Sequence, residues 1–415
     1  MSVINTILED IPVPKMIKVK QNFYAPEVQN IVSEMHVSIQ QANVLSRISK
    51  GDRVAIGIGS RGLADLHILT REMVNAVKSV GGEPFIFPAM GSHGGATAKG
   101  QREVLENLGI TEDFIGAPIS CSMEVVEIGR LPNGLAVYLD KEAHQADKIM
   151  FIARIKPHTA FRGPYESGLA KMITIGFGKQ KGAESAHAHS FKYMAKHVPD
   201  MAKMVIDKAP IIFGLGTIEN AYDRIAKVVA IPAEKILEDE PDLLEEAKSL
   251  MPRILFDPID VLVIDEIGKD ISGSGMDPNI TGRFATPYAS GGPEVNSIAV
   301  LDLTKETQGN ANGIGNADIT TRKLFEKIEW EKGFANALTS TVSKTVKLPM
   351  FLDSDKLAVQ AAIKTAALED STKIRLIWIK NTLQLKEIWI SEALLENAKE
   401  NNDIEILGES EYMAW

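Results

Sequence analysis

Cysteine is almost absent from this chain of 415 residues, in which Cys121 stands alone. A single thiol excludes an internal disulfide, a zinc site built from several thiolates within one chain, and an iron–sulfur cluster held by several cysteines. Any metal must therefore take nitrogen or oxygen ligands from the protein, or a ligand that a cofactor brings with it.

Long apolar runs and an excess of basic residues are missing as well. No uncharged stretch approaches the ~20 apolar residues that a membrane helix needs, and the first residues, MSVINTILEDIPVPK, do not form a basic leader followed by an apolar core. The formal net charge of -10 argues against nucleic acid as a partner, because neutralising phosphates needs clustered Lys and Arg. We expect a cytoplasmic protein without membrane or nucleic-acid partners, although a local basic site for a small anion stays possible.

Alternating strand and helix patterns predict the fold class. Buried strands are expected at 53–58 (RVAIGI), 84–90 and 148–154 (KIMFIAR), with an amphipathic helix over 63–80. A second block of the same kind begins at 261–264, and a charged helical stretch over 233–250 is expected to be interrupted at Pro241. Chain length favours more than one domain. The prediction is an α/β protein with two Rossmann-like, mainly parallel sheets, divided into residues 1–255 and 256–415.

A glycine-rich loop follows the first of these strands. Gly57, Gly59 and Gly62 fit the GxGxxG pattern between a strand and a helix, which brings a backbone close to a phosphate. Arg61, inside this loop, is a candidate anion clamp. The pattern lacks the acidic residue that a nicotinamide site wants after the second strand. The alternative reading is a tight turn that carries a surface arginine.

Titratable side chains gather in two other loops. His93, in MGSHGGAT, stands just before an expected helix, where the positive end of the helix dipole favours a neutral imidazole and hence a general base. His158 follows the strand 148–154 and is a candidate second base at the carboxyl edge of a sheet. Lys171 lies among small and apolar residues that would lower the pKa of its amine and make it nucleophilic. Structural roles, as a turn histidine or a surface lysine, are the competing readings.

An HxH pair, His187 and His189, offers imidazole ligands that suit nickel, copper, zinc or iron. In a helix, side chains two positions apart point in different directions. We therefore expect only one of the two to bind a metal, and the spacing does not say which.

Taken together, the ordered arginine, histidine, histidine, lysine and histidine resemble the lactate racemase family, whose members use a nickel-pincer nucleotide. The resemblance implies a 2-hydroxyacid racemase or epimerase whose active site lies in the cleft between two α/β domains. By that resemblance His93 and His158 are alternating bases, Lys171 is the covalent tether of the cofactor and His187 coordinates nickel. Cofactor contacts would also come from the glycine loop, and partners would include cofactor-synthesis proteins. The residues assigned to the glycine loop are Gly57, Gly59, Ser60, Arg61 and Gly62.

Two features depart from the family pattern. The run GIGSR lacks the acidic residue that the family tends to carry before the arginine, and FRGPYE is inserted between His158 and Lys171. Arg162 and Tyr165 in this insert are predicted to contact substrate, and Glu166 to help shape the pocket. Arg61 and Lys269 are candidates for holding the substrate carboxylate.

Two other functions stay open at this point. One is a nicotinamide-dependent oxidoreductase of a small hydroxy acid, built on the glycine loop. The other is a non-catalytic protein that stores or delivers a nucleotide or a metal.

Overall fold

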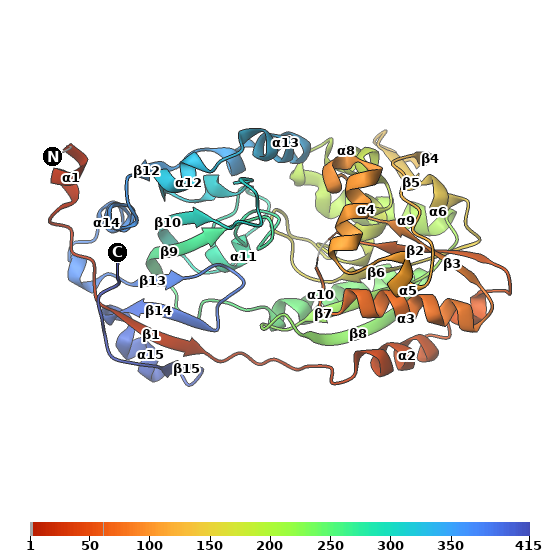
Figure 1. Ribbon diagram of the computed structural model, residues 1–415, viewed down its shortest axis with the longest axis horizontal. Helices are drawn as coiled ribbons and strands as arrows, with labels where there is room; N and C mark the ends of the chain where they lie inside the picture. Colours follow the sequence, from red (N-terminus) through yellow and green to blue (C-terminus); the bar gives the residue numbers. More distant parts are fainter. Residues whose placement is uncertain (1–2, 61) are drawn as a thin grey trace. The chain divides into compact units, whose positions relative to one another are not determined.

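A computed structural model describes residues 3–60 and 62–415. The chain folds into two compact units: Tyr24–Met251 forms one, and Met1–Phe23 together with Pro252–Trp415 forms the other. Each unit is an α/β structure built on its own sheet (Figure 1). The prediction of two α/β units with mainly parallel sheets is confirmed.

The unit 24–251 contains a five-stranded sheet in the order β3-β2-β6-β7-β8. The pairs β2–β3, β2–β6 and β6–β7 are parallel, and only β8 runs antiparallel to its neighbour β7. A separate hairpin pairs β4 with β5. The strands are β2 (Arg53–Ile58), β3 (Glu83–Pro88), β4 (Val125–Arg130), β5 (Ala136–Asp140), β6 (Lys148–Arg154), β7 (Ile211–Glu219) and β8 (Ile225–Pro232). The helices are α2 (Ile31–Gln41), α3 (Leu66–Ser79), α4 (Ala98–Asn107), α5 (Glu112–Ile115), α6 (Lys141–His144), α7 (Leu169–Lys171), α8 (Lys179–His187), α9 (Met194–Lys208) and α10 (Ile236–Leu250).

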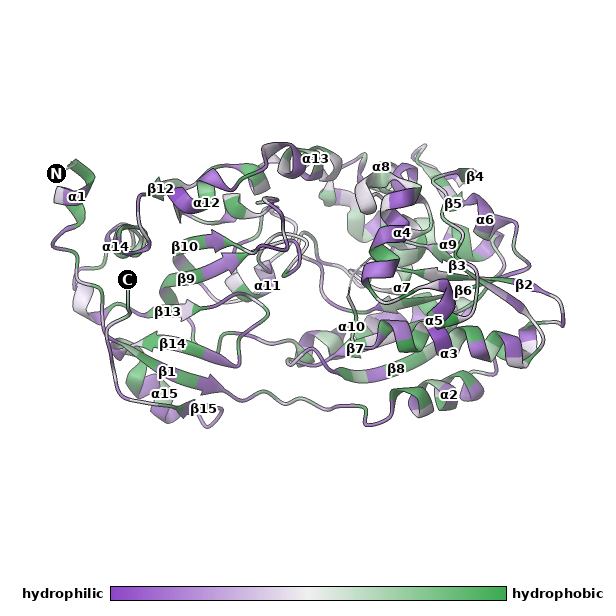
Figure 2. Cartoon of the chain, viewed as in Figure 1, coloured by the Kyte–Doolittle hydropathy of each residue, from purple (hydrophilic) through white to green (hydrophobic). Residues whose placement is uncertain are grey.

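Both faces of this sheet are covered, as the near-continuous apolar strands require. Val54, Ile56 and Ile58 of β2 share one buried cluster with apolar residues of α2 and α3. On the other face, a Cβ at Gly57 would lie 2.9 Å from the ring of Phe87 and 3.1 Å from that of Phe177, the residue that precedes α8 by two positions. Glycine at this position therefore lets the segment after α7 pack directly on β2. Figure 2 shows the apolar colouring of the strands beside helices that carry both colours.

The other unit is built on an eight-stranded sheet in the order β12-β11-β10-β9-β13-β14-β1-β15. Its first five strands are parallel, and the last three pair antiparallel. The strands are β1 (Met16–Gln21), β9 (Ile259–Ile267), β10 (Val295–Leu303), β11 (Ile319–Thr321), β12 (Met350–Leu352), β13 (Leu376–Ile379), β14 (Glu387–Ser391) and β15 (Ile404–Ile406). The helices are α1 (Val3–Leu8), α11 (Pro278–Thr281), α12 (Arg322–Glu326), α13 (Trp330–Ser340), α14 (Asp355–Thr365) and α15 (Leu395–Glu400).

The division of the chain differs from the expected ranges 1–255 and 256–415. The boundary between the two units at Met251–Pro252 lies close to the expected one. Residues 1–23, however, belong to the same unit as residues 252–415. The reason is β1, whose backbone pairs with β14 and β15. Its pattern, MIKVKQ, gave no indication of which sheet it would join.

The expected interruption at Pro241 is also corrected, because α10 continues through this residue from Ile236 to Leu250. Proline has no N–H, so the carbonyl one turn earlier, that of Leu237, loses its helical partner. The hydroxyl of Tyr165 donates a hydrogen bond to that carbonyl. A tertiary contact thus satisfies the group that the proline leaves without a partner.

Candidate functional site

The predicted site residues of the unit 24–251 follow the carboxyl ends of three neighbouring strands. Strand order reverses between β2 and β6, since the chain goes from β2 outward to β3 and later returns to β6 on the other side of β2. In open α/β sheets such a switch point is where ligands bind. Ser60 follows β2, His93 follows β3, and His158 and Lys171 follow β6. The topology thus brings loops separated by about a hundred residues to one edge of the sheet.

His93 and Ser60 are in direct contact across two of these loops. The Oγ atom of Ser60 shares a hydrogen bond with Nδ1 of His93. A hydroxyl can rotate to donate or to accept, so this contact is compatible with either neutral tautomer of the imidazole. The side chain of His93 is exposed, which suits a group that exchanges protons with a small molecule.

Buried polar side chains hold the His93 loop through hydrogen bonds to its backbone. Gln101 of α4 donates from Nε2 to the carbonyls of Gly91 (2.9 Å) and His93 (3.2 Å), and its Oε1 accepts from Nζ of Lys179 (3.3 Å). Lys179 also pairs with Asp140 at 3.0 Å, with both side chains buried. Burial raises the pKa of Asp140 and lowers that of Lys179, while the opposite charge of each partner acts against burial. This network ties the His93 loop to the start of α8.

His158 is held through its backbone and its ring. Its N–H donates to Oε2 of Glu166 (2.8 Å), and its Nδ1 accepts from the N–H of Ala160 (3.0 Å). Because a backbone N–H can only donate, a neutral His158 carries its ring proton on Nε2. The ring packs against Phe161 and Phe191, at centroid distances of 4.6 and 5.8 Å.

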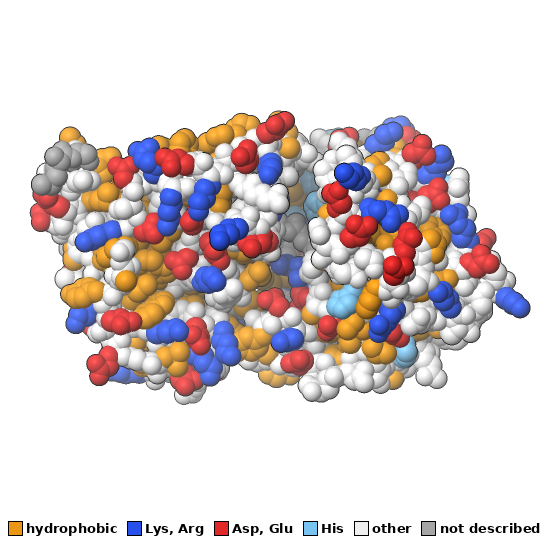
Figure 3. Space-filling model, in the orientation of Figure 1, with side chains coloured by type: hydrophobic (Ala, Val, Ile, Leu, Met, Phe, Trp, Pro, Cys, Tyr) orange, Lys and Arg blue, Asp and Glu red, His pale blue; other side chains and the backbone are white. Residues whose placement is uncertain are grey.

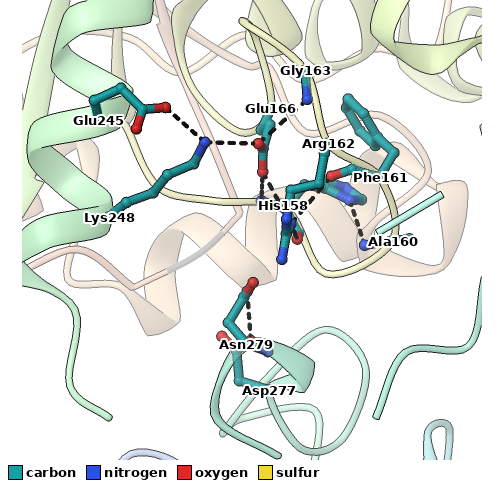
Figure 4. Close-up of polar contacts among 10 residues, drawn as sticks. All are labelled: His158, Ala160, Phe161, Arg162, Gly163, Glu166, Glu245, Lys248, Asp277 and Asn279. Atoms are coloured by element: carbon teal, nitrogen blue, oxygen red, sulfur yellow. Dashed lines mark hydrogen bonds and ion pairs between the residues drawn. The ribbon is translucent and has the colours of Figure 1, made fainter. Parts of the chain in front are cut away.

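The inserted FRGPYE segment closes on itself around Glu166, whose carboxylate is buried (Figure 4). Nη1 of Arg162 donates to Oε2 of Glu166 (3.2 Å) and to the carbonyl of His158 (2.6 Å). Lys248 of α10 reaches Oε1 of the same carboxylate at 3.2 Å. Arg162 and Tyr165 thus have structural contacts of their own, the latter with the carbonyl of Leu237. Their predicted contacts with substrate stay predictions.

Lys171 is the last residue of α7 and His187 the last of α8, and a π-helical segment, Met172–Gly176, lies between these helices. Such segments are frequent at functional sites. Burial lowers the pKa of His187, and the positive charge of Lys171 lowers it further, so these two groups lie within electrostatic reach of each other. Phe191 bridges to His158, since its ring lies 5.2 Å from that of His187. A base candidate and the metal-ligand candidate therefore pack against one aromatic ring, and the tether candidate Lys171 lies within electrostatic reach of His187.

The geometry of His187 fits a metal ligand. Its Nδ1 lies 2.7 Å from the carbonyl of Ala183, which can only accept, so the proton is on Nδ1 and the lone pair of Nε2 is available for coordination. Metal-binding histidines usually donate their other ring N–H to a carbonyl or carboxylate in this way, which fixes the orientation of the ring. His189 is exposed and packs against Tyr193 and His197 at 6.1 and 5.5 Å. Within residues 3–60 and 62–415, no three His, Cys, Asp or Glu side chains converge as a metal cluster.

The glycine loop is explained in part by packing. A Cβ at Gly59 would lie 2.9 Å from the methyl group of Met172, next to Lys171, and Gly57 faces Phe87 and Phe177 as described above. These glycines admit side chains of the protein itself, and their cofactor contacts stay a prediction. Gly62 is exposed, and Arg61 lies outside the described residues. In the other unit, Nζ of Lys269 donates to the carbonyl of Gly273 at 2.7 Å.

Three supporting residues escaped sequence reasoning. Phe191 resembles any core aromatic, and the sequence does not show that its ring separates two histidines. Glu219 accepts from the N–H of Ala64 (2.9 Å) and pairs with Arg154 (2.5 Å), which ties the loop after β2 to the ends of β6 and β7. Glu240, buried in α10, bonds the N–H of Ala170 (2.7 Å). The sequence showed Glu240 only as an acidic residue next to Pro241 in an amphipathic helix, which does not indicate that its side chain is buried.

The surface of the protein carries charged side chains of both signs. On the face drawn in Figure 3, basic and acidic side chains are interspersed. No helix among the described residues is long and apolar enough to cross a membrane.

The fold is similar to that of two solved structures. A protein from Thermotoga maritima matches with a TM-score of 0.53 and 11% identity, over 88% of this chain and 99% of that chain. The lactate racemase apoprotein from Thermoanaerobacterium thermosaccharolyticum matches with a TM-score of 0.50 and 14% identity, over 94% of this chain and 97% of that chain.

Sequence comparison finds a similarity to a known domain in the first half of the chain. Residues 7–198 match the lactate racemase N-terminal domain, the range that contains the ordered site residues. The matched range is less than half of the chain, and the likeness to the solved lactate racemase apoprotein is one of fold. No curated protein sequence matches the chain significantly.

Proposed function

We propose that this protein is a racemase or epimerase of a 2-hydroxyacid that works with a nickel-pincer nucleotide. The observation that carries the proposal is the arrangement around Phe191, where His187 presents Nε2 for coordination within electrostatic reach of Lys171. Lys171 would hold the cofactor covalently and His187 would coordinate its nickel. When bound, the cofactor supplies a centre that accepts a hydride from the substrate carbon and returns it.

His93 and His158 would handle the hydroxyl proton. The exposed imidazole of His93 can take this proton, because Ser60 accommodates either tautomer of its ring. His158, with Nδ1 held by Ala160, faces a substrate as a donor through Nε2–H while it is neutral. A neutral His158 thus offers a donor at Nε2, and the hydroxyl of Ser60 allows His93 to offer an acceptor there, as a pair of an acid and a base requires. Arg61 and Lys269 are the proposed cations for the substrate carboxylate.

The test is expression of the full chain together with the cofactor-synthesis proteins, followed by intact mass and metal analysis. We expect a covalent adduct on Lys171, loss of this adduct in Lys171→Ala, and nickel in the purified protein. His189→Ala is the matched control and should keep its nickel, whereas His187→Ala should lose it. Protein that keeps the apoprotein mass and contains no nickel would refute the proposal.

Activity is then assayed with both enantiomers of a panel of 2-hydroxyacids. His93→Ala and His158→Ala are expected to keep the adduct and lose turnover, because general acid–base catalysis contributes on the order of 10²–10⁴-fold. A nicotinamide-dependent oxidoreductase has less support, since Gly57 and Gly59 are accounted for by packing. Titration with NADH distinguishes the two, because binding that survives Lys171→Ala would favour the oxidoreductase. A storage protein would have no turnover to lose.

A further inference from the structure

Helix α10 contacts the segment between His158 and Lys171 from one side, along several of its turns. The carbonyl of Leu237 accepts from the hydroxyl of Tyr165. Lys248 pairs with the buried carboxylate of Glu166 at 3.2 Å. Between them, Glu240 projects toward the turn that carries Lys171. Positions 237, 240 and 248 recur at helical spacing, so they share one face of α10.

The contact made by Glu240 is the most demanding of the three. Its side chain is 1% exposed, and burying a carboxylate is costly unless hydrogen bonds compensate. Its Oε2 accepts from the N–H of Ala170 at 2.7 Å, and the N–H of Leu169 donates to the same carboxylate. These two N–H groups belong to the first turn of α7, where no helical carbonyl is available to them. One side chain therefore satisfies the donors just before Lys171.

Gly168 shows how closely the carboxylate approaches. A Cβ at this position would lie 2.2 Å from Oε1 of Glu240, well inside van der Waals contact. The backbone of Gly168 has φ 178°, an extended value open to any residue. Position 168 is thus a glycine because the carboxylate of Glu240 leaves no room for a side chain, and not because the backbone conformation requires glycine.

We propose that Glu240 is the positioning residue for Lys171: its carboxylate fixes the turn 168–171 and so sets the direction in which the lysine side chain leaves it. This inference rests on the proposed function for the role of Lys171 as tether, while the contact itself is independent of any cofactor. Glu240 lies outside the stretch that suggested the family in sequence, and nothing in its own vicinity marks it as functional.

The test is hydrogen–deuterium exchange of the full chain without cofactor, resolved at the amides of Leu169 and Ala170. Glu240→Met keeps the volume and removes both acceptor oxygens, so exchange at both amides should rise at least tenfold. Glu240→Gln keeps one acceptor oxygen and should give a smaller rise. Asp242→Asn is the matched control, an exposed acidic residue on the same helix, and should leave both amides unchanged.

Gly168→Ala tests the same contact by changing the backbone residue that lies against the carboxylate of Glu240. Its Cβ should displace the carboxylate and raise exchange at the two amides in the wild-type background, but add little in Glu240→Ala, where the side chain is already gone. Acetylation of the Lys171 amine by an N-hydroxysuccinimide ester gives a second readout, and its rate should increase several-fold in Glu240→Met. Exchange and acetylation that match Asp242→Asn in every Glu240 variant would overturn the inference.

The outcome separates this inference from the proposed function. If the wild-type chain forms no adduct but the Glu240 variants loosen the turn, the contact holds and the tether role of Lys171 fails. If the adduct forms in wild type and in Glu240→Met to the same extent, with unchanged exchange, the tether role holds and Glu240 has no positioning role.

Discussion

The buried carboxylate of Glu240 gives a quantitative prediction for stability against pH. Burial raises its pKa from 4.5 to about 7, against the hydrogen bonds from Ala170 and Leu169 that lower it. Because the folded-state pKa is above the unfolded value, the folded state binds more protons between these two values. The contribution of Glu240 to stability is therefore fully present below about pH 4.5 and is lost as pH rises through 7.

The magnitude follows from the size of this pKa change. At about 1.4 kcal/mol per pKa unit, raising the pH from about 5 to about 8 should cost the wild-type protein ~2–3 kcal/mol through this one group. Glu240→Gln cannot ionise and escapes this loss. The free energy of unfolding of the variant minus that of wild type should thus increase by ~2–3 kcal/mol between about pH 5 and about pH 8. Any offset that the amide itself adds is constant and does not change with pH.

Urea unfolding of the full chain at several pH values measures the effect. All four tryptophans, residues 330, 378, 389 and 415, lie in the unit that does not contain Glu240. Far-UV circular dichroism follows both units, and tryptophan fluorescence follows one, so the pH-dependent difference should appear in the former. Asp242→Asn serves as control. Profiles of stability against pH that run parallel for wild type and Glu240→Gln would refute the reasoning.

Three further changes have defined outcomes. Asp140→Asn leaves the charge of Lys179 buried without its partner and should lower the free energy of unfolding by ~3–5 kcal/mol, measured in urea; a loss under 1 kcal/mol would contradict this. Tyr165→Phe removes one hydrogen bond to α10 and should cost about 1 kcal/mol in the same assay, with no cost expected if water replaces it. His187→Ala should abolish nickel retention without changing circular dichroism, whereas His189→Ala should retain the metal; equal loss in both would remove the distinction drawn from their contacts.

Sequence periodicity predicted the strands that lie in the middle of each sheet. Residues 148–154 form β6 as expected, and 53–58 form β2. Such strands are buried on both faces and read as continuous apolar runs. β1 and β15 lie at or next to a sheet edge, and the partners of β1 are remote in sequence. No local pattern could indicate that residue 19 pairs with residues 388 and 406.

The candidate site was predictable where the chemistry of a residue is unusual for its surroundings. His93, His158, Lys171 and His187 stood out because titratable groups occurred among glycines and small residues. The groups that hold them did not stand out, because Glu240 acts through a helix some seventy residues further along the chain. Their roles depend on distances and burial, which one sequence does not encode locally.

The placement of β1 has a consequence for the order in which the protein can assemble during synthesis. Residues 24–251 have every strand of their own sheet as soon as they leave the ribosome, whereas β1 must wait for residues 387–406, made near the end. A waiting strand is an open template for wrong pairing. Lys18 and Lys20 alternate with the buried residues of β1, and charges at such positions discourage aggregation. The two lysines thus protect a strand that is translated long before its pairing partners.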